Sequence, residues 1–111
     1  MGATNFETFQ PGAFVDAAFE AAKKSAQYYH GHGGYTGTIA EKTAYRIINE
    51  IFTEAGMPYD KALDLAHDLY EKRDARIDDK WGPAGAIRVK QRASKNRPRM
   101  DGWLFFGIAS E

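Results

Sequence analysis

The segment GWLFFGIA, residues 102–109, is apolar throughout and holds no polar side chain in eight positions. A strand buried on one face only would alternate apolar and polar residues, so this run predicts a central strand that is covered on both faces. The preceding segment AIRVK, residues 86–90, does alternate. It predicts a half-buried strand whose Arg88 and Lys90 side chains face solvent.

Two amphipathic segments predict helices. Apolar residues recur at helical spacing from residue 12 to 29, and Pro11 is suited to the first helical position. Residues 58–73 place apolar side chains on one face and charged side chains on the other, which is the most regular helical pattern in the chain. The composition of residues 78–85 indicates a turn before the AIRVK strand.

The region between the two helices is less regular. Residues 35–40, YTGTIA, are β-branched and bounded by glycine, which predicts a short strand. Residues 43–55 fit a helix, although Tyr45–Ile48 could instead pair in a hairpin with that strand; the periodicity favours the helix. Gly56 and Pro58 end this segment in either case.

Together these elements predict one α+β domain over residues 1–111, with a small, mainly antiparallel sheet and two or three helices packed on one face. The composition, 43% hydrophobic and 14% aromatic, supplies enough apolar material for one core. No cysteine is present, which excludes disulfides and thiolate metal sites. No run approaches eighteen apolar residues and residues 1–11 do not resemble a signal peptide, so we expect a cytoplasmic protein without membrane contact.

The zero formal net charge hides a strong asymmetry. Residues 80–100 contain no acidic side chain but seven basic ones: Lys80, Arg88, Lys90, Arg92, Lys95, Arg97 and Arg99. Each lysine or arginine beside a phosphate backbone adds affinity by releasing counterions, so the run from residue 88 to 99 is a candidate phosphate-binding loop. A solvated hairpin loop without a binding role explains the same composition.

The densest glycine cluster is a second candidate site. Such a segment lets successive backbone N–H groups converge on an anion, but known phosphate-binding loops join a strand to a helix, whereas this cluster follows a helix. A helix stop is therefore the favoured interpretation, and a ligand-binding loop is the alternative. The candidate ligand-binding residues of this cluster are Gly31, His32, Gly33, Gly34 and Tyr35, followed by Thr36 and Gly37.

Few other residues are candidates for chemistry. Trp81 and Gly82 lie in the predicted turn, where the indole could stack on a base or sugar or could anchor the core. His30 or His32 could act with Glu41 as acid and base, although capping and turn formation are the favoured explanation for the carboxylate. We expect no metal site and no cofactor, because the three histidines form no paired ligand motif.

Three blocks of the sequence resemble a group of short, uncharacterised proteins encoded by bacteriophages and prophage-like elements. The blocks are GHGGYTGTIAEK at 31–42, DKWGPAG at 79–85 and WLFFGIAS at 103–110. The resemblance implies a small accessory protein that acts by binding in the cytoplasm of a bacterial host. It carries over no activity and no catalytic residue.

Three functional hypotheses follow. The first is non-catalytic binding of a phosphorylated, nucleotide-like ligand or a host defence protein, with Gly31–Gly37 and Trp81–Gly85 forming the pocket and Arg88, Lys90 and Arg92 meeting the phosphate charge. The second is inhibition of a host protein, or nucleic-acid binding, through the basic loop 88–99. The third is a small hydrolase or transferase that uses a histidine with Glu41. The chain also leaves room for a homodimer.

Overall fold

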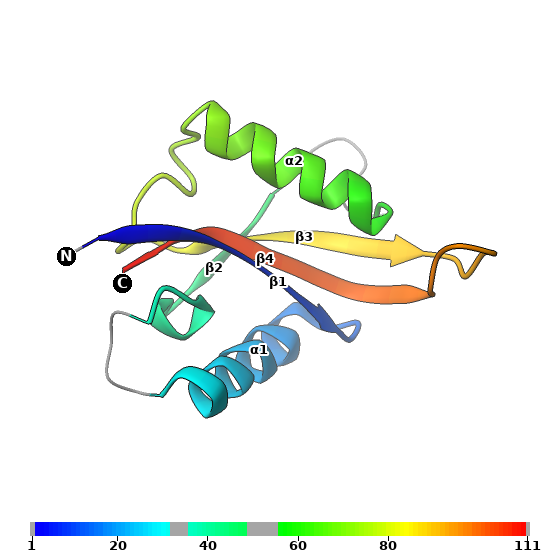
Figure 1. Ribbon diagram of the computed structural model, residues 1–111, viewed down its shortest axis with the longest axis horizontal. Coiled ribbons are helices and arrows are strands. Elements are labelled where there is room, and N and C mark those ends of the chain that lie inside the picture. Colours follow the sequence, from blue (N-terminus) through cyan, green and yellow to red (C-terminus); the bar gives the residue numbers. More distant parts are fainter. Residues whose placement is uncertain (1, 32–35, 49–55, 111) are drawn as a thin grey trace.

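The computed structural model describes residues 2–31, 36–48 and 56–110, and in these the strands form one mixed sheet (Figure 1). The strand order is β1-β4-β3-β2. β4 pairs with β1 and β3 in antiparallel fashion, and β2 runs parallel to β3. The strands are β1 (Ala3–Pro11), β2 (Tyr45–Ile47), β3 (Ala84–Gln91) and β4 (Met100–Ser110).

The predicted central strand is confirmed. β4 lies between β1 and β3, and Leu104, Phe105 and Phe106 are completely buried. Successive side chains of a strand point to opposite faces, so these three residues require cover on both sides of the sheet. The central position of β4 therefore explains why residues 102–109 are apolar without alternation.

The two helices α1 (Val15–His30) and α2 (Tyr59–Glu71) supply that cover. The α+β class and both helices are confirmed, but the expectation that the helices pack on one face is wrong. Figure 1 shows α1 below the sheet and α2 above it. The physical reason is β4, because a strand that is apolar on both faces leaves one of them exposed unless each face has its own helix.

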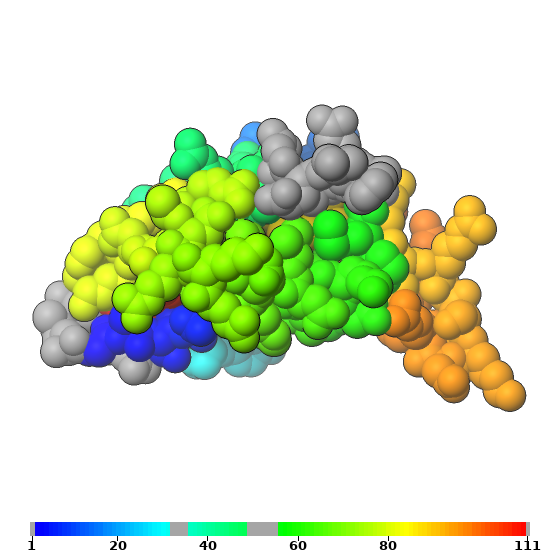
Figure 2. Space-filling model, turned by 90° about the horizontal axis from the view of Figure 1, so that it is seen from above, coloured from blue at the N-terminus to red at the C-terminus, as the bar shows by residue number. Residues whose placement is uncertain are grey.

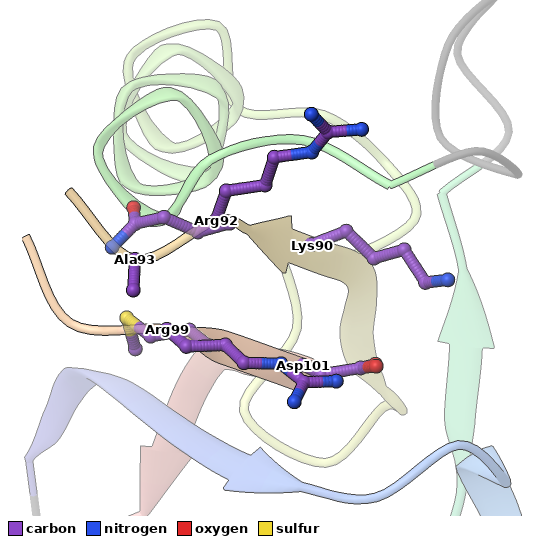
Figure 3. Close-up of a pocket in the computed structure, with 7 residues that line it drawn as sticks. Lys90, Arg92, Ala93, Arg99 and Asp101 are labelled. Carbon is purple, nitrogen blue, oxygen red and sulfur yellow. The ribbon is translucent and has the colours of Figure 1, made fainter.

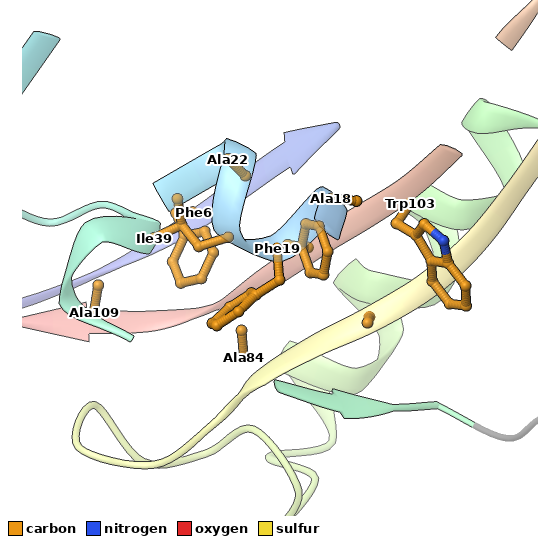
Figure 4. Packing of buried hydrophobic residues seen from close by; sticks show 10 residues of the cluster. Phe6, Ala18, Phe19, Ala22, Ile39, Ala84, Trp103 and Ala109 are labelled. Carbon is orange, nitrogen blue, oxygen red and sulfur yellow. The ribbon is translucent and has the colours of Figure 1, made fainter. Parts of the chain in front are cut away.

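On the α1 side, Phe19 is the centre of an aromatic cluster (Figure 4). Its ring lies 5.5 Å from that of Phe105 and 5.1 Å from that of Tyr45, both edge-to-face, a favoured geometry for aromatic pairs. The short 3-10 helix η1 (Ile39–Glu41) adds the buried Ile39. The buried residues of this cluster are Phe6, Ala18, Phe19, Ala22, Ile39, Ala84, Ala86, Trp103, Phe105 and Ala109.

On the α2 side, one polar group reaches into the sheet. The Tyr70 hydroxyl lies 2.7 Å from the Phe6 carbonyl oxygen and 3.1 Å from that of Gly107, and it accepts a hydrogen bond from the Gly107 N–H at 2.9 Å. Burial raises the pKa of this phenol well above its ordinary value. Tyr70 therefore fastens α2 to the pair of strands β1 and β4 by hydrogen bonds as well as by apolar contact.

Three expectations from the sequence are wrong. Residues 3–11 form β1, and Pro11 ends this strand instead of beginning a helix, which starts at Val15. The strand expected at 35–40 is replaced, in its described part, by η1, where the Thr38 hydroxyl caps the Ala40 N–H. Residues 45–47 form β2, not a helix, because pairing with β3 outweighs the local periodicity; residues 49–55 lie outside the described part.

The turn after α2 yields a prediction about pH. The Arg76 guanidinium binds both carboxylate oxygens of Asp74 at 2.9 Å, and the Arg76 N–H donates to the same side chain, which lowers the pKa of Asp74 to about 2. Because this pKa is depressed in the folded state, its contribution to stability is present above pH ~4 and is lost as the pH falls through about 2. Carboxyl NMR titration should give that midpoint, and Arg76→Gln should raise it towards 3.8. A wild-type midpoint near 3.8 would contradict the pairing.

Candidate functional site

The turn that carries Trp81 is held by a buried lysine. Lys42 is 1% exposed, and its Nζ donates to the carbonyl oxygens of Asp79, Lys80 and Gly82 at 3.2, 3.3 and 2.9 Å. Burial lowers the pKa of Lys42, and the negative charge of Asp79 opposes part of that shift. An ammonium group has three N–H donors, and each of the three carbonyl oxygens can accept one of them. These hydrogen bonds connect segment 36–42 to the turn formed by residues 79–82.

Trp81 itself is exposed to 65%, and the Lys80 ammonium lies 5.3 Å from the centre of its ring. The Asp79 carboxylate accepts the Trp81 N–H at 2.9 Å and shapes the turn. The indole is therefore not a core anchor. Gly82 is half-buried in the same turn, with its carbonyl bound to Lys42.

The glycine cluster is described only in part. Gly31, at a φ of 86°, ends α1 and donates its N–H to the Gln27 carbonyl, so it is a helix stop. His32, Gly33, Gly34 and Tyr35 lie outside the described residues. A pocket of about 230 Å³ lies between β1 and the C-terminal part of α1. His30 and Thr38 are among its lining residues.

Glu41 and His67 each make a structural contact in the described part of the chain. The Glu41 carboxylate accepts hydrogen bonds from the Thr36 N–H and hydroxyl at 3.2 and 2.7 Å. His67 pairs with Glu7 at 2.8 Å. Within residues 2–31, 36–48 and 56–110, no group of three or more histidine or acidic side chains could hold a metal ion.

Arg88 does not face solvent as expected. Its guanidinium binds the Asp101 carboxylate at 2.5 Å and the Gly102 carbonyl at 2.8 Å, and its side chain is only 11% exposed. It also lies 5.6 Å from the Trp103 ring centre. The Asp101 carboxylate on the neighbouring strand therefore neutralises the positive charge of Arg88. The two side chains can meet because both face the α1 side of the sheet.

Beyond Arg88, the β3–β4 hairpin concentrates basic side chains. Lys90, Arg92 and Arg99 line a pocket of about 410 Å³ whose remaining lining includes Met100 and Asp101. In Figure 3 these three basic side chains extend from the two strands towards the same side. Figure 2 shows the hairpin projecting from one end of the molecule, and every residue from 92 to 99 is exposed.

Most of this positive charge is uncompensated. Among the described residues, the neighbouring acids already have partners, since Asp101 binds Arg88 and Asp60 binds Arg97. Lys90, Arg92, Lys95 and Arg99 form no ion pair with any described residue. Unpaired cations on a projecting hairpin create a local positive field in a chain of zero net charge.

The structure therefore separates the residues that the sequence combined in one pocket. Trp81 and Gly82 precede β3 and the basic hairpin follows it, and a strand of eight residues puts them more than about 20 Å apart. Lys90 and Arg92 do lie together, joined by Arg99 from the opposite strand. Lys42 was missed, because an isolated lysine has no sequence signal that distinguishes it from a solvated one.

No family model, curated protein or solved structure matches this chain. In the described part of the chain, no helix has the length and apolar character needed to cross a membrane.

Proposed function

We propose that the protein binds nucleic acid without catalysis, through the phosphate backbone and the basic β3–β4 hairpin. The observation that carries this proposal is the set of four cations, Lys90, Arg92, Lys95 and Arg99, that project from one end of the molecule without carboxylate partners among the described residues. A two-stranded ribbon fits the major groove of a duplex, and its basic side chains neutralise phosphates.

The arrangement of these cations supports a polyanion as the partner. Lys90 and Arg92 are two residues apart along the chain, and Arg99 adds a third charge from across the hairpin. A row of charges along a ribbon matches a ligand that repeats its own charge along a line, as a phosphate backbone does. The resemblance to phage-encoded proteins is consistent with an accessory role in a bacterial host.

A small phosphorylated ligand is the second candidate, because the pocket between Lys90, Arg92 and Arg99 has a volume of about 410 Å³. This value falls within the ~300–1,000 Å³ of small-molecule sites. Nucleotides that bind there would raise the melting temperature of the protein without requiring a polymer.

The test is fluorescence anisotropy with labelled duplex and single-stranded DNA and RNA over a series of salt concentrations. Removing three charges with Arg92→Gln, Lys95→Gln and Arg99→Gln should reduce the slope of log Kd against log salt by about 2 to 3. All three side chains are exposed, so the fold should remain intact. We expect affinity at low salt to fall at least ~30-fold, since several phosphate contacts are lost together.

The matched control removes three exposed charges elsewhere, with Lys24→Gln, Arg46→Gln and Lys72→Gln. Both triple variants have the same net charge, so only a localised site distinguishes them. An equal loss of affinity in both variants, or no wild-type binding at low salt, would refute the proposal. A melting-temperature increase with mononucleotides alone would favour the small-ligand candidate.

A further inference from the structure

The two edges of the sheet differ greatly in length. β2 forms one edge and contains three residues, whereas β1 forms the other and contains nine. Among the described residues, β4 is the only strand that pairs with β1, so its second side offers free backbone groups. An edge of this length can accept another strand.

The hydrogen-bond pattern between β1 and β4 shows which backbone N–H and C=O groups of β1 point away from β4. Pro11 lies opposite Gly102, and the next N–H, that of Gly12, donates to the Asp101 carbonyl at 3.0 Å. Because bonded and non-bonded pairs alternate in antiparallel strands, the even-numbered residues of β1 direct their N–H and C=O groups to β4. The position of the Tyr70 hydroxyl between Phe6 and Gly107 agrees with this phase. Ala3, Asn5, Glu7 and Phe9 therefore point their backbone groups outwards.

This edge lacks the features that usually prevent strand addition. Residues 3–9 contain no proline, no lysine and a single charged side chain, Glu7. That carboxylate is held by His67 of α2, on a face of the sheet and not on its edge. Pro11 protects only the end of the strand.

We propose that β1 pairs with β1 of a second copy of this chain in antiparallel orientation, which joins the two sheets into one. A twofold axis at Phe6 places Ala3 opposite the partner's Phe9 and Asn5 opposite the partner's Glu7. This register pairs all four outward-facing residues, and it avoids the repulsion of two glutamates that an axis at Glu7 would produce.

A second copy is the occupant because an antiparallel strand is complementary to itself about a twofold axis. That axis is perpendicular to the sheet, so the α1 helices of both copies lie on the same face. Tyr29 is 75% exposed on α1 and lines the pocket beside Thr8 and Gln10 of β1. This exposed aromatic side chain therefore lies beside the strand that a second copy would approach. The proposal rests on the sheet and not on the basic hairpin.

The first test is the mass in solution by light scattering, together with a proline scan of the edge. The wild-type protein should have twice the chain mass of 12.4 kDa. Asn5→Pro removes an N–H group that points outwards from β1. It should weaken self-association about 10- to 100-fold, because the twofold symmetry repeats the lost intermolecular hydrogen bond at two places in the dimer. Thr4→Pro is the matched control, since it removes an inward N–H and should instead unfold the β1–β4 ladder. A monomeric wild type at ~100 µM, or an intact Asn5→Pro dimer, overturns the proposal.

Cysteine cross-linking tests the register independently of any proline strain. The chain has no cysteine, so single variants carry one thiol each. A bonded antiparallel pair separates Cα atoms by about 5.5 Å, which suits a disulfide. A mixture of Asn5→Cys and Glu7→Cys should therefore cross-link, and Asn5→Cys alone should not. Equal cross-linking of Asn5→Cys alone, or none in the mixture, overturns the register.

Discussion

Gly102→Ala should lower the melting temperature by at least about 10 °C, because overpacking against backbone costs about 3 kcal/mol and each kcal/mol is worth ~4 °C in a domain of this size. A Cβ at Gly102 would lie 2.2 Å from the Gln10 carbonyl oxygen and 2.7 Å from the Pro11 Cα. Both of these atoms belong to the backbone of β1, so rotation of a side chain cannot relieve the steric clash. Thermal unfolding followed by circular dichroism measures the effect.

Gly107→Ala is the matched control in the same strand. Its Cβ would meet the Phe6 ring at 3.3 and 3.4 Å, and a ring can shift by a few tenths of an ångström. We expect a loss of about 1 kcal/mol, well below that of Gly102→Ala. Equal losses in the two variants would show that β1 does not approach β4 as closely as described.

Lys42→Met should destabilise the protein by about 3 kcal/mol, since it leaves three carbonyl oxygens of one turn without their shared donor. Met fills much of the same volume, so the loss reports the ammonium group more than a cavity. The Asp79–Gly82 turn should loosen, and the fluorescence of Trp81 should shift and become easier to quench. Urea unfolding and acrylamide quenching measure the two effects.

Trp103 also fluoresces, so the quenching experiment is best done in a Trp103→Phe background. Lys24→Met provides the control, because Lys24 is an exposed residue of α1. It should change stability by less than about 0.5 kcal/mol. If Lys42→Met were as stable as Lys24→Met, the three carbonyl contacts would have no energetic role.

The parts of the fold that the sequence predicted are those with a strong local pattern. The run from Gly102 to Ala109 and the amphipathic α2 each have one dominant periodicity. β1 was missed because Phe6 and Phe9 precede Pro11, a residue that local rules place at a helix start. β2 depends on parallel pairing with β3, a contact between Tyr45 and Ala84 that local periodicity does not contain.

For the candidate site, the sequence identified the basic run but not which charges remain available. Arg88 and Lys90 look equivalent in AIRVK, yet only Arg88 binds Asp101, across the hairpin. The strand register alone does not decide this choice, because Lys90 lies directly opposite Asp101, whereas Arg88 lies opposite Trp103 and reaches the carboxylate along the diagonal. The same register brings Arg99 beside Arg92. Lys42 and the Trp turn meet only in the folded chain, at a separation of about forty residues.

The pairing of β1 with β4 also sets the timing of folding in the cell. Ala3 lies opposite Ser110, so the synthesis of β4 follows that of β1 by about a hundred residues. At a translation rate of about 5–20 residues per second, roughly 5–20 s pass between the synthesis of β1 and that of its partner strand. During this interval α1 and α2 can form, but the sheet cannot close. In a nascent chain, β1 therefore stays without its partner strand until β4 has been synthesised.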